Sequence, residues 1–284
     1  MNSSRTYLIV GANNPLSLRL TENLPSKNTF VLYNSAPTFK KEGVTYYGID
    51  DLNKLPKIDV VFIISAFVPD RMDSFNDNLQ LFNVNIQFIK KISDCFKDSK
   101  LIYASSVSIY KNIPGKAISE DSEIDPLSPY AISKLWAEKI IKQNCSYSIF
   151  RISSLIGSGI KERTFVPIVI NEAFNNKTIT LYGNGSRVQN YINYLDVCKL
   201  LIKASEIKTN GTYLAVNPLS ISNTGVAELI KELIPDVSIK YIGSDASSSF
   251  RYNAERTYAD LSYTPSITIK ESINEILKWK TEQF

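Results

Sequence analysis

The chain has 284 residues, a net charge of +4 and an apolar fraction of 44%, which suit one large globular domain, or one large and one smaller domain. It contains no histidine, which excludes a Ser-His-Asp triad, a histidine general base and imidazole metal ligands. It has no basic tract, no apolar run near the ~18 residues of a membrane span and no signal-peptide pattern. Its three separated cysteines, Cys95, Cys145 and Cys198, favour a reducing compartment over disulfides or zinc. We therefore expect a cytoplasmic protein that binds no nucleic acid, membrane or metal.

The first predicted unit is a strand, a glycine turn and a helix. Thr6–Val10 has the pattern of a buried strand, Gly11 follows it, and Leu16–Leu24 places apolar residues on one helical face. This order is typical of the opening of a dinucleotide-binding fold, in which the helix N-terminus faces a pyrophosphate. Asn14 tolerates a left-handed backbone, and Pro15 suits a first helical turn. Taken alone, the segment fits an ordinary strand-to-helix turn equally well.

The rest of the chain alternates between strand and helix patterns. The continuous apolar run Asp59–Ser65 is typical of a parallel sheet that is covered on both faces. The other predicted strands are Thr29–Tyr33, Val44–Tyr47, Leu101–Ala104, Tyr147–Ile152, Thr178–Tyr182, Thr212–Val216 and Ser238–Tyr241. The predicted helices are Phe75–Phe96, Ser128–Gln143, Phe165–Asn175, Asp196–Ala204, Ser220–Ile230 and Ile269–Lys280.

One helix carries the candidate chemistry. Tyr130 and Lys134 are four residues apart and share a helical face, behind a cap at Ser128 and a first-turn Pro129. A nearby ammonium lowers the pKa of a phenol from its reference value of about 10, so Tyr130 can exchange a proton with a substrate oxygen. Ser106, at a strand end, supplies a hydroxyl to the same oxygen. An amphipathic helix with a snorkelling lysine is the alternative interpretation.

The order of glycine turn, strand-end serine and Y-x-x-x-K helix resembles the short-chain dehydrogenase/reductase superfamily. It is most similar to the extended branch, the nucleotide-sugar epimerases, dehydratases and reductases. Nearly the whole chain takes part, and a second matching segment keeps Gly183, Gly185, Tyr191 and Asp196. The resemblance implies an α/β fold, a Rossmann-type doubly wound parallel sheet with a smaller C-terminal substrate-binding α/β subdomain.

The resemblance also implies a division of the chain. Residues 1–155 are expected to form the dinucleotide-binding Rossmann domain, and residues 186–210 to return to it. Residues 156–185 and 211–284 are expected to form mainly the substrate-binding subdomain.

A cofactor, NADP or NAD, is implied as well. The expected cofactor-binding residues are Gly11, Asn13, Asn14, Pro15, Leu16, Asn34, Asp51, Leu52, Ser65, Ala66, Tyr130 and Lys134. Asp50 is a close rival of Asp51, and the turn is degraded, because Asn14 and Ser17 stand where the family has glycines. Family members that use NAD usually carry an acid where this chain has Asn34, so NADP is preferred, with Lys40 and Lys41 as candidates for its 2′-phosphate.

The expected substrate is a nucleotide-diphosphate sugar, bound by Ser106, Ser154, Gln189 and Arg251. Gln189 replaces a diphosphate-binding arginine of the family, and Arg256 is as good a candidate as Arg251. Ser106, Tyr130 and Lys134 are the expected catalytic residues. Helices 75–96 and 128–143 are expected to form a homodimer interface, by analogy with the family.

Three functions remain open at this point. Dehydration is disfavoured, because Val107-Ser108 stand where 4,6-dehydratases have an Asp-Glu pair. We predict a 4-keto-6-deoxy sugar reductase, with a nucleotide-sugar C4 epimerase as the alternative. A non-catalytic dinucleotide-binding sensor or scaffold is the alternative from another class.

Overall fold

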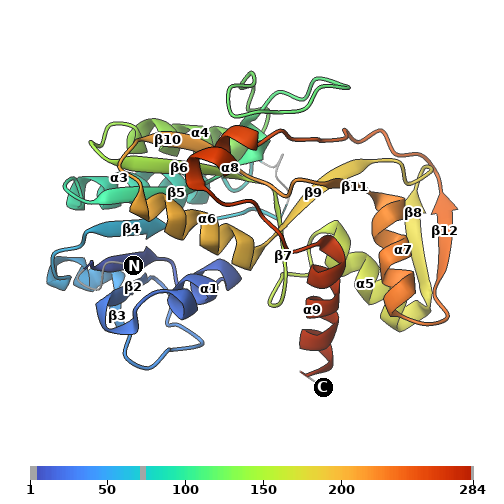
Figure 1. Cartoon of the computed structure of the whole chain (residues 1–284), viewed down its shortest axis with the longest axis horizontal. Helices are drawn as coiled ribbons and strands as arrows, with labels where there is room; N and C mark the ends of the chain where they lie inside the picture. The colour runs from blue at the N-terminus through green and yellow to red at the C-terminus, as the bar shows by residue number, and fades with distance from the viewer. Residues whose placement is uncertain (1–4, 71–74, 283–284) are drawn as a thin grey trace.

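The computed structural model describes residues 5–70 and 75–282. Its main feature is a seven-stranded sheet in the order β10-β6-β5-β4-β1-β2-β3, in which every neighbouring pair is parallel (Figure 1). The strands of this sheet are β1 (Tyr7–Val10), β2 (Thr29–Tyr33), β3 (Thr45–Gly48), β4 (Val60–Ile63), β5 (Lys100–Ser106), β6 (Tyr147–Ile152) and β10 (Gly211–Ala215). This confirms the predicted Rossmann-type fold.

The central strands β1, β4, β5 and β6 bury both of their faces, whereas the edge strand β3 has no buried residue. In β1, Tyr7 and Ile9 pack into one core cluster, whereas Leu8 and Val10 pack into another. This follows from the two-residue period of a strand, and it explains why the strands have continuous apolar sequences. The first cluster lies under α1 (Pro15–Asn23) and α6 (Tyr194–Glu206), and the second under α3 (Phe88–Cys95) and α4 (Pro129–Ile141).

A smaller subdomain lies to the right of the main sheet in Figure 1. It contains the three-stranded sheet β11-β9-β7 and the two-stranded sheet β12-β8. Its elements are β7 (Ser154–Ile156), α5 (Phe165–Asn176), β8 (Thr178–Tyr182), β9 (Val188–Asn193), β11 (Ser220–Ser222), α7 (Asn223–Leu233), β12 (Ser238–Ile242) and α9 (Ile269–Thr281). The remaining elements are α2 (Asn78–Leu81), α8 (Glu255–Leu261) and the short helices η1 (Ser26–Asn28), η2 (Ile49–Lys54), η3 (Phe82–Gln87) and η4 (Val107–Ile109).

The predicted division at residue 211 is wrong for the strand that begins there. β10 pairs with β6 along Gly211–Ala215 and forms the edge of the main sheet, not part of the smaller subdomain. Conversely, β9 joins the small sheet, although it lies inside the segment 186–210 that was expected in the Rossmann domain. Within that segment it is α6 that returns to the main sheet. The chain thus crosses between the two parts at points that differ from the predicted boundaries at 186 and 211.

The predicted helix Phe75–Phe96 is not uniform. It begins at Asn78 and passes through a π-helical segment, η3, before α3. Such wide turns are rare and often occur at functional sites. Here the widening lies at Asn85, whose side chain faces inward and binds the backbone of another segment, as described below. Across the described residues, the structure has no helix with the length and apolar character that a membrane crossing requires.

Candidate active site

The glycine turn brings three strand ends together. Gly11 has φ +111°, and its backbone N–H donates to the carbonyl oxygen of Leu32 at 2.9 Å. A Cβ atom at Gly11 would lie 3.2 Å from Ser65, which follows β4. Only glycine combines this backbone conformation with so close an approach. Gly11 and Ser65 therefore lie at one crevice at the carboxyl end of the sheet, where open α/β sheets bind ligands.

The two residues that replace glycines in the turn have taken other roles. Asn14 is the N-cap of α1, with an extended backbone and a side chain that accepts from the Ser17 N–H, so it does not use the left-handed conformation that asparagine tolerates. Ser17 donates its hydroxyl to the Gly11 carbonyl at 2.6 Å, and Pro15 is the first helical residue. Leu16 buries its side chain in the core, so only its backbone remains available to a ligand.

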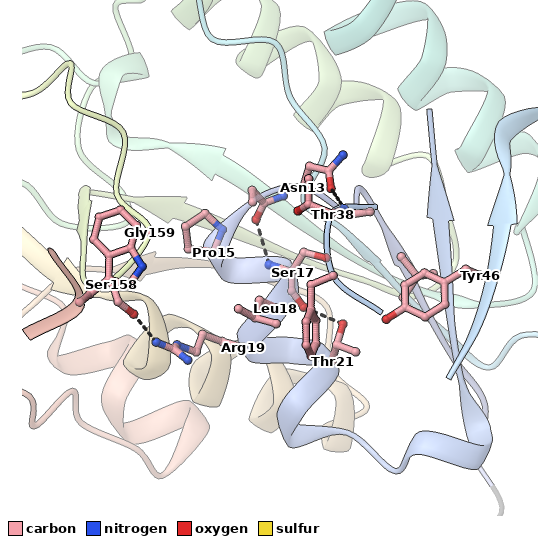
Figure 2. Close-up of a pocket in the computed structure, with 15 residues that line it drawn as sticks. Asn13, Pro15, Ser17, Leu18, Arg19, Thr21, Thr38, Tyr46, Ser158 and Gly159 are labelled. Carbon is pink, nitrogen blue, oxygen red and sulfur yellow. Dashed lines mark hydrogen bonds between the residues drawn. The ribbon is translucent and has the colours of Figure 1, made fainter. Parts of the chain in front are cut away.

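Asn13 fixes the loop that follows β2 to this turn. Its side-chain nitrogen donates to the carbonyl oxygens of Ser35 and Ala36, and its oxygen accepts from the Thr38 N–H at 3.0 Å. A cavity of about 300 Å³ begins here and runs over α1, with Thr38 and Tyr46 on one side and Ser158 on the other (Figure 2). The other lining residues include Pro15, Leu18, Arg19, Thr21, Phe39, Gly159 and Trp279.

The two lysines proposed for a 2′-phosphate are already engaged. Lys41 donates to the carbonyl oxygens of Thr21 and Glu22 at the end of α1, at 2.9 and 3.1 Å. Lys40 lies over the Tyr46 ring, 5.7 Å from its centroid. Neither ammonium is held ready for a phosphate by the fold.

The remaining predicted cofactor residues lie at different depths. Asn34 is exposed just after β2, and Ser65 donates its backbone N–H to Val10 at 2.9 Å, with Ala66 beside it. Asp51 forms an ion pair with Lys54 at 2.7 Å and lies close to Gly48 at the end of β3. By contrast, the Leu52 side chain packs against the second core cluster and borders a cavity formed by residues that precede β4 and β5.

Asn85 holds the segment after Ser65 in place. Its amide accepts from the Phe67 N–H at 2.8 Å, donates to the Phe67 carbonyl at 2.9 Å and donates to Ser133 of α4 at 3.1 Å. The side chain is buried and spans three segments. The segment 65–67 and helix α4 are therefore fixed relative to each other.

The structure brings Ser106, Tyr130 and Lys134 together at the carboxyl end of β5. Ser128 caps α4, and Pro129 begins it, as the sequence predicted. Tyr130 is buried, and its phenol forms a hydrogen bond with the Ser106 hydroxyl. Lys134 donates to the carbonyl oxygen of Ala104 at 2.6 Å. The three residues thus lie around the last residues of β5.

The electrostatics of this group differ from the prediction. Burial raises the pKa of Tyr130 to about 12, and the hydrogen bond from Ser106 offsets only part of that rise. The ammonium of Lys134 is directed at a carbonyl, so the prediction that it makes the phenol acidic is wrong for the protein alone. Burial lowers the pKa of Lys134 to about 7, against the opposing charge of Glu138.

The predicted substrate residues lie around the small sheet. Ser154 of β7 is exposed and pairs in register with Tyr191 of β9, two residues beyond Gln189. Gln189 donates to the Asn223 side chain at 2.9 Å. Arg251 is exposed beside the start of β9, whereas its rival Arg256 is paired with Asp121. Ser154, Gln189 and Arg251 thus lie around the small sheet, whereas Gly11 follows a strand of the main sheet.

Sequence reasoning missed the residues that complete the cavity from distant parts of the chain. Ser158 and Glu275 join α1 to α9, because Arg19 donates to both side chains at 2.6 and 2.9 Å. A Cβ at Gly159 would lie 3.1 Å from Pro15. No local spacing links residues that are more than a hundred positions apart, so the sequence held no signal for them.

These residues fit a dinucleotide. The close approach at Gly11, the capped N-terminus of α1 and the crevice at the carboxyl ends of parallel strands are the features that such ligands use. A buried phenol, hydroxyl and ammonium lie at the same edge of the sheet. Fold and site together define a Rossmann-type dinucleotide-binding class of protein.

Comparisons with known proteins agree with this class. A model of the NAD dependent epimerase/dehydratase family matches residues 18–216, beginning just after the altered glycine turn. The chain therefore belongs to the NAD-dependent epimerase/dehydratase family, a family of enzymes, as the sequence predicted.

Individual relatives are distant. The chain is 25% identical over 283 residues to the uncharacterized UDP-glucose epimerase YtcB of Bacillus subtilis, with 92% of this chain and 85% of the relative covered. It is 26% identical to a UDP-glucose 4-epimerase of Mycoplasma genitalium, with 66% and 62% covered.

Two solved structures show the same fold. A UDP-N-acetylglucosamine 4-epimerase from Methanobrevibacter ruminantium M1 matches with a TM-score of 0.87 and 22% identity, covering 99% of each chain. MoeE5, solved in complex with UDP-glucose and NAD, matches with a TM-score of 0.82 and 19% identity, covering 98% of this chain and 99% of its own.

Proposed function

We propose that the protein is a nucleotide-sugar C4 epimerase that uses NAD. The observation that carries the proposal is the meeting of Ser106, Tyr130 and Lys134 at the sheet edge that also holds Gly11. The epimerases among the relatives support the choice of reaction. The proposal replaces the reductase favoured by the sequence with the alternative that the sequence left open.

Each residue of the group has a distinct role in the proposal. The nicotinamide ring would supply the hydride acceptor. Tyr130 would hold and move the proton of the C4 hydroxyl, and Ser106 would donate a hydrogen bond to the same oxygen. Lys134, buried beneath them, would hold its positive charge near the reacting groups.

Two features favour epimerisation over dehydration and over reduction of a 4-keto sugar. Dehydration needs further acids, and Val107 and Ser108 follow Ser106 instead. The sequence favours the reductase through the short chain and the missing acid at the end of the second strand, which also favours NADP. Lys40 and Lys41 have other partners, so we propose NAD in its place.

The substrate is proposed to span the two parts of the molecule. Its sugar would lie at Tyr130, and its diphosphate would lie near Ser154, Gln189 and Arg251. This follows from the position of the small sheet beside the main one (Figure 1).

Purified protein incubated with NAD and UDP-glucose or UDP-N-acetylglucosamine tests the function. An epimerase converts the sugar at C4, detected by NMR, without net consumption of NAD. A reductase would instead consume reduced cofactor in proportion to a 4-keto sugar. Binding of NAD without either turnover would favour the non-catalytic dinucleotide-binding sensor or scaffold, and absence of both turnover and binding would reject the proposed function.

We further propose a homodimer through α2, η3 and α4. Large apolar side chains are exposed on these elements, with Leu79 73% and Trp136 53% exposed. Phe82 packs edge-on against Trp136 at 6.5 Å, so the patch is continuous across two elements. Such patches mark interaction sites on soluble proteins.

A further inference from the structure

A buried ion pair lies directly beneath the Ser106, Tyr130 and Lys134 group. Arg151 of β6 and Glu138 of α4 are 4% and 1% exposed. Two hydrogen bonds join them, from Arg151 Nη2 to Glu138 Oε2 at 2.9 Å and from Nε to Oε1 at 3.1 Å. A two-pronged contact of this kind fixes orientation as well as charge.

A third group binds the same carboxylate. The Ser105 hydroxyl donates to Glu138 Oε1 at 2.6 Å. Ser105 lies opposite Arg151 in the register of β5 and β6, and it directly precedes Ser106. Glu138 therefore ties helix α4 to the end of β5 that carries Ser106.

Arg151 extends the cluster to the next loop. Its Nη1 donates to the Tyr110 hydroxyl at 2.7 Å and to the Glu120 carbonyl at 3.1 Å. The loop between Ser106 and α4 is thus held at both of these positions by one guanidinium. Each charged group in the cluster has its partners.

Stability alone is a weak reason for this arrangement. Burying two charges costs desolvation, and apolar residues of similar volume often serve stability equally well. The position of Glu138 indicates another reason. It lies four residues after Lys134 and eight after Tyr130, on the same face of α4.

The surroundings of Lys134 identify the charge that matters to it. Tyr130 and Glu138 face it from α4, and the Tyr103 ring of β5 lies 4.5 Å from its ammonium. Arg151 of β6 contacts Glu138 and acts on Lys134 through that carboxylate. Burial disfavours the ammonium, and Glu138 is the charge that opposes this effect.

We propose that Glu138 is a positioning residue of this site. Held by Arg151 and Ser105, its carboxylate fixes α4 against Ser106 and keeps Lys134 charged. The use of Lys134 in turnover rests on the proposed function. The charge of Lys134 and the effect of Glu138 on that charge are independent of the proposed function.

The test is a pH titration of Lys134 by NMR of isotope-labelled lysines, with the signal assigned from Lys134→Arg. Glu138→Gln preserves the shape and most hydrogen bonds but removes the charge. We expect the titration midpoint of Lys134 to fall by about half a pH unit or more, a roughly threefold change in its ionisation constant. The matched control is Glu123→Gln, an exposed acid paired with Lys111, which is expected to leave the midpoint unchanged.

An unchanged or raised midpoint in Glu138→Gln would overturn the proposal. If that variant does not fold, the charge-balanced double variant Glu138→Gln with Arg151→Gln replaces it, and a smaller fall in midpoint is expected, because loss of the Arg151 charge offsets part of the effect. Turnover of a nucleotide sugar by the wild-type protein is measured separately. Its absence would reject the proposed function, while the titration would still decide the role of Glu138.

Discussion

At the scale of single residues, the site depends on how burial acts on two ionisable groups. Tyr130 is held in its protonated form, because burial raises its pKa to about 12. Lys134 is brought close to neutrality by the same effect. A buried proton donor beside an amine that gains or loses its proton near neutral pH is the kind of perturbation that marks functional sites.

The first prediction concerns Tyr130. Tyr130→Phe removes the hydroxyl but keeps the ring, so turnover is expected to fall by about 10²–10⁴, the usual contribution of a positioned acid–base group. Affinity for NAD should change little, as measured by calorimetry. Tyr241→Phe, at an exposed strand position, is the control. Full activity in Tyr130→Phe would refute the proposed mechanism.

The second prediction concerns the stability that Lys134 contributes. Burial lowers its pKa from 10.5 to about 7, so between these values the unfolded chain binds more protons than the folded chain. Stability therefore rises with pH across this window, by at most about 1.4 kcal/mol per pH unit from this group. Lys134→Met should lose this slope, with Lys231→Met on α7 as the exposed control.

Chemical denaturation at constant ionic strength measures the slope. The free energy of unfolding of wild type minus that of Lys134→Met is expected to grow between about pH 7 and about pH 9. A flat difference over that interval would show that the folded protein does not disfavour the ammonium.

At the scale of elements, the N-terminus of α1 links local folding to ligand binding. Asn14 caps the helix, while Gly11 lets β1 approach the end of β4. Where the family has two glycines, Asn14 caps the helix with its side chain and Ser17 binds the Gly11 carbonyl with its hydroxyl, and both bonds hold the turn.

The third prediction tests this cap. Asn14→Ala is expected to cost about 1 kcal/mol of stability, the usual effect of losing an N-cap, and also to weaken NAD binding. Ser222→Ala removes the cap of α7, which accepts from the Gly225 N–H. This control should lose similar stability but keep its NAD affinity. Equal NAD affinity in both variants would place the dinucleotide elsewhere.

At the scale of the whole molecule, the exposed apolar face of α2, η3 and α4 is the feature that a single chain leaves unexplained. Trp136 lies on the same helix as Tyr130, so pairing of this face would also support the catalytic helix. The two sides of α4 would then serve assembly and chemistry.

The fourth prediction concerns this face. Wild-type protein is expected to be dimeric by light scattering, and Trp136→Glu monomeric, because a charge at a buried interface is costly. Leu219→Glu changes an even more exposed apolar residue outside the face and should remain dimeric. A monomeric wild type would end the dimer proposal.

The sequence determined the local structure of this protein and the type of its chemistry. Apolar patterns located β2, β6 and β8 at their observed ends, and Ser128 and Pro129 located the start of α4, because strand burial and helix capping depend on neighbouring residues. The spacing of Tyr130 and Lys134 predicted that both residues share one helix, and both lie on α4.

Only the tertiary structure decided what those groups contact. The carbonyl of Ala104 that binds Lys134, the loop that Asn13 clamps, the ion pair of Glu138 with Arg151 and the place of β10 at the sheet edge all join distant segments. The order of strands in the sheet sets these contacts, and sequence periodicity does not encode that order. The pKa values follow the contacts, which is why a phenol expected to be acidic is instead held protonated by burial.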